Sequence, residues 1–217
     1  IAISSTFTLH ANAKRLDVVT SFDNTCKNHR LRVVFPTRLD CDRTDAEANF
    51  DVISRDIHVK KDNAYYGKPN PQYPMFRFVD MTDGDNGFAI LNNSGLREYE
   101  AMDSAERPLA VTLLRAYMFR QAPVFGRWEA YPGMERTQCL GDWEWSYAIY
   151  PHSGDWHNGV YEQAEDVNLP LEAAQAGAHA GTLPKSLSFL EILDAPMQLT
   201  AFKRAEDQEN AFVVRLF

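Results

Sequence analysis

The fold class is decided by the stretch LDVVTSFDNTCKNHRLRVVFP, residues 16–36. Apolar and polar side chains alternate there with a period of two, which is typical of half-buried strands. The residues that share a face are Leu16, Val18, Thr20 and Phe22, and then Leu31, Val33 and Phe35. Pro36 ends the second run because proline cannot donate to a ladder. The stretch predicts two antiparallel strands joined by the polar loop 23–29, with Arg30 and Arg32 on the opposite face of the second strand.

The same alternation recurs along the chain and makes it mostly β. Further predicted strands cover residues 50–54, 75–80, 87–91, 109–116, 145–150, 187–193, 199–203 and 212–217. A tight turn is expected at 83–87, because the glycines and asparagine of this DGDNG sequence tolerate the positive φ of hairpin turns. About ten short runs separated by turns favour an all-β fold, a large antiparallel β-sandwich.

One segment departs from the β pattern. Residues 161–180 are rich in Ala and Glu, but Pro170 interrupts them, so the sequence predicts one short helical excursion. With 217 residues and no internal repeat or Gly/Ser-rich linker, we expect one β-domain over 1–217. The long loops predicted at 38–49, 60–73 and 119–143 have lengths that usually carry function or pack on a neighbouring domain.

Charge and composition exclude some partners. The net charge is −8, from 22 basic and 30 acidic side chains, whereas binding to a phosphate backbone needs clustered Lys and Arg. We therefore expect no nucleic-acid partner. No apolar run approaches the roughly 20 residues that span a bilayer, and no leader opens the chain, so we expect a soluble protein without a membrane partner. Because the chain begins at Ile1 and ends within a predicted strand, it reads as a fragment.

The three cysteines indicate the compartment. Cys26, Cys41 and Cys139 form an odd set without CxxC spacing, which fits a reducing, cytoplasmic environment better than a disulfide framework. A bridge between Cys26 and Cys41 stays open as the minority alternative.

Motifs of catalysis are mostly lacking in the sequence. There is no HExxH, GxSxG, P-loop or GxGxxG pattern, which argues against the common zinc, nucleophile and phosphate sites. The densest polar cluster is the HSGDWH segment, residues 152–157, whose two imidazoles and one carboxylate could converge on a metal. Histidines in such loops more often cap backbone groups, so we predict no metal site in this chain.

Aromatic residues make up 12% of the chain, and several fall in predicted loops. Flat rings with a polar edge stack on sugars, but they also bury well at domain interfaces, and we favour domain packing. The loop aromatics considered are Tyr65, Tyr66, Tyr73, Trp128, Tyr131, Trp143, Trp145 and Trp156.

Several blocks of the sequence form an ordered set. They are NHRLRVVFPT (28–37), YPM with FVD (73–80), GFAILN with GLREYE (87–100), YAIYPH with GDW (147–156) and SFLEI (188–192), continued by LTAFKRAED (199–207) and VVRLF (213–217). In this order the blocks resemble the C-terminal β-domain of bacterial-type family 38 α-mannosidases, and the similarity covers nearly the whole chain from about Leu16. The resemblance implies a supersandwich-like β fold and a role in hydrolysis of α-mannosides.

In that family the zinc and the aspartate nucleophile belong to an N-terminal catalytic domain, which has no counterpart here. The resemblance therefore implies an inactive fragment with no catalytic residue and no cofactor of its own, zinc being expected in the missing domain. The implied partners are that catalytic domain and a mannose-containing glycan or mannoside. By analogy, the hairpin around Asn92, Tyr99 and Arg107 is the first candidate for the rim of the substrate cleft, and Trp156 is a further cleft candidate.

Two other functions stay open. The chain could be a stand-alone carbohydrate-binding β-sandwich module, with Trp156 or Trp143 as the stacking platform. It could also be a purely structural domain, homo-oligomerisation included.

Overall fold

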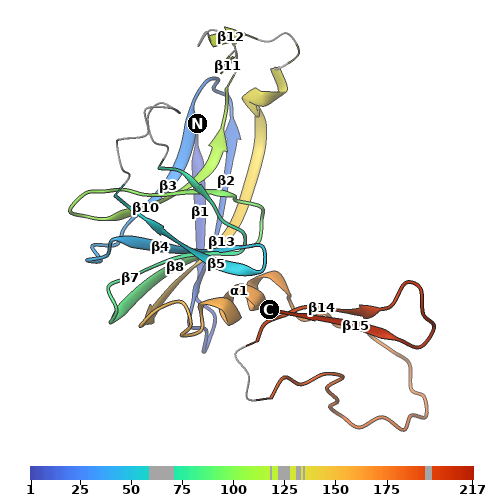
Figure 1. Ribbon diagram of the computed structural model, residues 1–217. Helices are drawn as coiled ribbons and strands as arrows, with labels where there is room; N and C mark the ends of the chain where they lie inside the picture. The colour runs from blue at the N-terminus through green and yellow to red at the C-terminus, as the bar shows by residue number, and fades with distance from the viewer. Residues whose placement is uncertain (59–70, 118, 122–127, 131–132, 134, 194–196) are drawn as a thin grey trace. The chain divides into compact units, whose positions relative to one another are not determined.

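The computed structural model describes residues 1–58, 71–117, 119–121, 128–130, 133, 135–193 and 197–217. The chain divides into two compact units, Ile1–Pro170 and Leu171–Phe217, each described here by itself. The first unit holds a large antiparallel sheet, a smaller one and the helix α1 (Figure 1). The mostly β character and the one short helix confirm the fold class predicted from the alternation.

The seven-stranded sheet has the order β1-β2-β13-β8-β7-β4-β5. Its strands are β1 (Ile3–Thr8), β2 (Leu16–Asn24), β13 (Gly141–Ser153), β8 (Asn86–Asn92), β7 (Phe78–Thr82), β4 (Arg43–Ala48) and β5 (Asp51–Asp56). The four-stranded sheet has the order β3-β10-β9-β6. Its strands are β3 (Arg30–Pro36), β10 (Pro108–Arg115), β9 (Glu98–Ala101) and β6 (Tyr73–Pro74). The pair β11 (Phe119–Gln121) and β12 (Trp128–Ala130) and the short 3-10 helix Glu135–Gln138 complete the unit.

The main core forms where the apolar faces of the two sheets meet. Val18 and Phe22 of β2 are buried in it, as the alternation predicts, and Leu31, Val33 and Phe35 of β3 pack against it from the other sheet. The remaining members of this core include Val79, Ile90, Tyr99, Leu109, Val111 and Tyr147. Burial of these side chains on both facing sheets is what makes the architecture a sandwich.

Helix α1 (Val160–Asn168) covers the opposite face of the seven-stranded sheet. A second core lies beneath it, where Phe78 of β7 packs edge-on against Tyr161 of α1 at a ring distance of 6.1 Å. Arg77 adds a polar link, because its guanidinium pairs with buried Glu47 and lies 4.6 Å over the Tyr161 ring. The helix ends before Pro170, so the short helical excursion is confirmed.

Some expectations about strand pairing and loops in the first unit are wrong. Strands β2 and β3 both form, but they do not pair, because β1 and β13 occupy the two edges of β2 and β3 pairs with β10. The loop predicted at 38–49 contains β4, whose sequence RTDAEA has too few large apolar side chains to be recognised as a strand. The tight turn is confirmed between β7 and β8, with φ of +100° at Gly84.

The second unit consists of residues 171–193, which run exposed and without helix or strand, and a hairpin of β14 (Leu199–Arg204) and β15 (Phe212–Leu216). The strand predicted at 187–193 is therefore wrong. Alternating apolar residues are present in SLSFLEI, but a strand needs a ladder partner, and none of the described strands pairs with this segment.

Some predicted features concern single residues. The three cysteines are free thiols, with Cys26 exposed and Cys41 buried. Burial raises the pKa of the Cys41 thiol to about 11, so this side chain behaves as a small apolar group. Tyr65, Tyr66 and Tyr131, and most of the loop predicted at 60–73, lie outside the described residues. Of the helices that the structure describes, none is long and apolar enough to cross a membrane.

Candidate functional site

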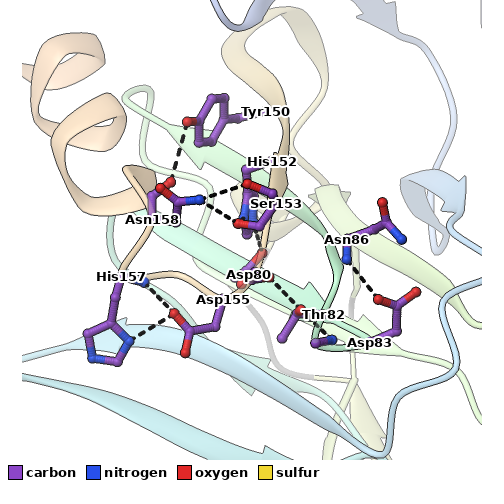
Figure 2. A network of polar contacts seen from close by, with 12 residues as sticks. Asp80, Thr82, Asp83, Asn86, Tyr150, His152, Ser153, Asp155, His157 and Asn158 are labelled. Carbon is purple, nitrogen blue, oxygen red and sulfur yellow. Dashed lines mark hydrogen bonds and ion pairs between the residues drawn. The ribbon is translucent and has the colours of Figure 1, made fainter.

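The HSGDWH segment, residues 152–157, forms the end of β13 and most of the loop that connects β13 to α1. Figure 2 shows this loop held against the β7–β8 hairpin and the start of the helix. Thr82 donates its hydroxyl to the Gly154 carbonyl at 2.5 Å, and the Gly154 amide donates to the Asp85 carbonyl at 2.9 Å. Asn158 closes the loop by donating from Nδ2 to the carbonyl and the hydroxyl of Ser153, both at 2.8 Å.

A buried ion pair lies at the base of this loop. Nε2 of His152 is 2.8 Å from Oδ1 of Asp80, and the two side chains are 2% and 0% exposed. Strand register explains the contact, because His152 of β13 lies directly opposite Gly87 of β8. A Cβ at Gly87 would come within 2.0 Å of the imidazole, so only glycine leaves room for the ring to lie across the strand and reach Asp80.

The His152 imidazole is placed to carry a proton on both nitrogens. Nε2 faces the Asp80 carboxylate and Nδ1 faces the Ser153 carbonyl at 3.2 Å; both are acceptors, so an imidazolium fits this environment best. Burial by itself would lower the pKa of His152, but the hydrogen bond and charge of Asp80 outweigh it, and the pKa is raised. Burial also raises the pKa of Asp80, against the opposing pull of His152. The pair thus holds its proton, but the ring is too buried to pass it to a substrate.

This pair predicts a pH dependence of stability. The folded-state pKa of His152 is raised. The stability that the protonated ring gives the folded state is therefore present in full below the ordinary imidazole pKa of about 6.5, and it is lost as the pH rises through the raised value. We expect the free energy of unfolding, measured by urea denaturation across that window, to fall more steeply in the wild type than in His152→Gln. Equal slopes in the wild type and His152→Gln would contradict the assignment.

The second imidazole of the loop turns to a different carboxylate. Nδ1 of His157 and its backbone amide both lie 3.0 Å from Oδ1 of Asp155. Burial by itself would raise the pKa of Asp155, but the hydrogen bonds from His157 outweigh it, and the pKa is lowered. His152 and His157 are therefore each engaged by a separate carboxylate. Among the residues that the structure describes, no group of three or more His, Cys, Asp or Glu side chains could hold a metal ion.

Asn92 ends β8 and organises the turn that follows it. Its side-chain amide donates to the carbonyls of Phe76, at 2.7 Å, and Leu96, at 2.6 Å. Its Oδ1 accepts from the backbone amides of Ser94, Gly95 and Leu96 at 3.0–3.2 Å. The side chain is 2% exposed, so its contacts in this structure hold the backbone together.

Tyr99 and Arg107 belong to a different hairpin from Asn92. Strand β9, which carries Tyr99, pairs with β10 in the four-stranded sheet, and Arg107 lies in their turn. The expectation of one hairpin around all three is wrong, because the turn after Asn92 carries the chain from one sheet to the other. Tyr99 is fully buried between the sheets, and its hydroxyl lies 3.0 Å from Oγ1 of Thr44.

Arg107 anchors a small charged cluster at the β9–β10 turn. Its Nη1 donates to Asp103 at 3.0 Å, and Asp103 also lies 2.6 Å from Nδ1 of His58. Nε2 of His58 in turn lies 3.0 Å from Asp42. The hydrogen bonds that the His58 imidazole makes to Asp103 and Asp42 raise the pKa of His58, and the His58 hydrogen bond lowers the pKa of Asp103. The cluster joins the ends of three segments that are distant in sequence.

The two tryptophans considered for sugar stacking both lie against other rings. Trp156 is half-buried beside the second core, with His157 stacked on it at a centroid distance of 3.7 Å. Trp143 stacks on Trp145 at 5.6 Å and donates its indole N–H to the Cys139 carbonyl at 2.8 Å. Each indole therefore has one face in contact with a neighbouring ring.

A ladder of ion pairs across the four-stranded sheet was missed by the sequence reasoning. Arg32 of β3 reaches Glu100 of β9 at 2.6 Å, and Arg30 reaches Glu98 at 3.4 Å, over the intervening β10. The sequence contains a signal for it. RLR and EYE each carry two like charges two residues apart, which places both charges on one face of a strand, and the two motifs are opposite in sign. These four charges neutralise each other and form a polar outer face.

Comparison with known proteins supplies the family. A family model described as the C-terminal domain of glycosyl hydrolases family 38 matches residues 1–122. The chain is 29% identical over 208 residues to a Halalkalibacterium halodurans protein with the provisional name mannosylglycerate hydrolase, covering 95% of this chain and 22% of that one. It is 28% identical to Alpha-mannosidase 2C1 of Mus musculus, over 86% of this chain and 16% of that one.

Solved structures agree with the sequence matches. An α-mannosidase from Enterococcus faecalis superposes with a TM-score of 0.83 at 30% identity, over 99% of this chain and 23% of that one. The chain spans about a fifth of the length of the first curated relative that it matches. On these matches, together with the sandwich that carries them, the chain belongs to glycosyl hydrolase family 38 and contains its C-terminal domain.

Proposed function

We propose that this chain is the non-catalytic C-terminal part of a glycosidase that hydrolyses α-mannosides. It would pack on a catalytic domain located upstream in the same polypeptide and shape the rim of the substrate cleft. The observation that carries the proposal is that proteins named α-mannosidase or mannosylglycerate hydrolase match nearly the whole chain over only 16–23% of their own lengths.

The local geometry favours a non-catalytic role. The groups that could have served catalysis in the 152–157 loop are engaged with each other, since Asp80 pairs with buried His152 and Asp155 with His157. Glu98 and Glu100 are neutralised by arginines of β3. Retaining hydrolysis needs two carboxyl groups that can approach one glycosidic bond, and carboxylates held in such pairs are poorly suited to that task.

Zinc does not fit the residues described in this chain, which form no cluster of metal-ligating side chains. On this proposal the zinc and the two catalytic carboxyl groups lie in the upstream domain. The substrate would be a mannose-containing glycan or a small mannoside. The free thiols of Cys26, Cys41 and Cys139 support placement in the cytoplasm.

The proposal is tested on the isolated chain and on the longer polypeptide together. We expect the longer polypeptide to hydrolyse an aryl α-mannoside, and we expect the NMR spectrum of the isolated chain to stay unchanged during titration with mannose and α-mannobiose. No hydrolysis by the longer polypeptide would refute the proposal. Millimolar shifts confined to the Trp156 or Trp143 region would instead identify an independent carbohydrate-binding module.

A further inference from the structure

The second unit, Leu171–Phe217, has almost no core of its own. None of its described residues is buried, and residues 171–193 are exposed throughout. The only regular structure among its described residues is the β14–β15 hairpin, and an isolated two-stranded hairpin is marginally stable at best in water. This unit therefore depends on a surface outside itself for stability.

The hairpin has one face suited to such a surface. Register places Phe202 opposite Val214 and Arg204 opposite Phe212, and alternation puts both pairs on the same side of the hairpin. Phe202 and Phe212 stack at a centroid distance of 5.4 Å, and they are 43% and 62% exposed. The apolar face consists of Leu199, Phe202, Phe212, Val214 and Leu216, and it also carries Arg204.

The opposite face of the hairpin differs in chemistry. Lys203 lies opposite Val213, and Ala201 opposite Arg215, so charged and small side chains predominate there. Lys203 is already paired with Glu206 at 2.6 Å. Because exposed contiguous apolar surface marks an interaction site, this contrast indicates which face of the hairpin contacts a partner.

We infer that the apolar face of β14–β15 docks on an apolar surface of the upstream part of the same polypeptide and fastens the C-terminal unit to it. The inference rests on the proposed function, because that function supplies the upstream part. The Enterococcus faecalis α-mannosidase aligns with 99% of this chain, so the hairpin segment is included in a protein whose remaining length is about three times that of the matched part.

Covalent linkage favours the upstream part of the polypeptide over a second copy of the chain as the partner of the hairpin. An attached partner is present at an effective concentration in the millimolar range, whereas a second copy must associate from dilute solution. Two partly exposed phenylalanines and three aliphatic side chains make a small apolar face, and small faces support association mainly when the partner is tethered.

Amide hydrogen exchange tests the inference in the wild-type protein. We expect the β14 and β15 amides to exchange at least about 100-fold more slowly in the longer polypeptide than in the isolated 217-residue chain. Equal exchange rates in the two proteins would overturn the inference. Protection in the isolated chain that grows with its concentration would point instead to a second copy, and concentration-independent protection there would point to the unit Ile1–Pro170.

Matched variants of the longer polypeptide test which face is used. Phe202→Asp and Phe212→Asp should restore fast exchange in both strands, whereas Val213→Asp, on the opposite face, should leave them protected. The same effect from all three variants would refute docking through the apolar face. Activity separates this inference from the proposed function, because a wild-type polypeptide that hydrolyses mannosides with an unprotected hairpin refutes only the docking.

Discussion

Gly87→Ala should lower the free energy of unfolding of this chain by about 3 kcal/mol, the lower end of the range for breaking a buried ion pair. The new Cβ would fall 2.0–2.6 Å from three atoms of the His152 ring, so the ring must leave its place opposite residue 87. Asp80 would then remain buried without its hydrogen-bonded partner, and its other carboxylate oxygen has no hydrogen bond within the described residues. Urea denaturation at neutral pH measures the loss.

The control for this prediction is another glycine to alanine change. Gly177 has no atom near its added Cβ, so Gly177→Ala should change the stability by less than about 0.5 kcal/mol. His152→Ala gives a second route to the same unpaired Asp80 and should be similarly destabilising. A Gly87→Ala protein as stable as the wild type would show that the His152–Asp80 pair does not contribute as its geometry indicates.

Asn92→Ala should cost about 2–4 kcal/mol of stability, because it leaves several buried backbone groups without partners. The side chain donates to two carbonyls and accepts from three amides around the turn that joins the sheets. Alanine can replace none of these bonds, and the site is too buried for bulk water to do so. Thermal and urea unfolding of the chain give the measurement.

The neighbouring asparagine provides the control. Asn93 is exposed and makes one hydrogen bond, to the Val167 carbonyl at 3.2 Å, so Asn93→Ala should cost less than about 1 kcal/mol. The predicted place of Asn92 at the cleft rim is tested by the same variant in the longer polypeptide. Unchanged stability with a lowered kcat/KM would contradict the structural role and favour contact with the sugar.

Most of the fold could be predicted because side-chain alternation reports burial directly. β8 and β10 were located to within a residue or two, since each carries a nearly continuous run of apolar residues, FAIL in β8 and LAVTLL in β10. β1 and β4 were missed because their sequences ISSTFT and RTDAEA contain few large apolar residues. Pairing was harder to predict than strand position, because both sheets present apolar faces and alternation cannot show which sheet a strand joins.

The candidate site was less accessible from sequence for a related reason. The HSGDWH segment was recognised as polar and dense, but its key partners, Asp80 and Gly87, come from β7 and β8 and are fixed by register. Asn92 and Tyr99 were selected by family resemblance, and the structure shows strong local packing roles for both. Their place at the rim, like those of Arg107 and Trp156, stays a prediction until the longer polypeptide is studied.

The most direct measurement is the rate at which the purified 217-residue chain hydrolyses an aryl α-mannoside in the presence of added zinc. The longer polypeptide, assayed in parallel, shows that the substrate and conditions are suitable. We predict a rate for the chain that equals the buffer blank at every zinc concentration. Turnover by the chain above that blank, lost when zinc is chelated, would contradict the view that this sandwich supports chemistry located elsewhere.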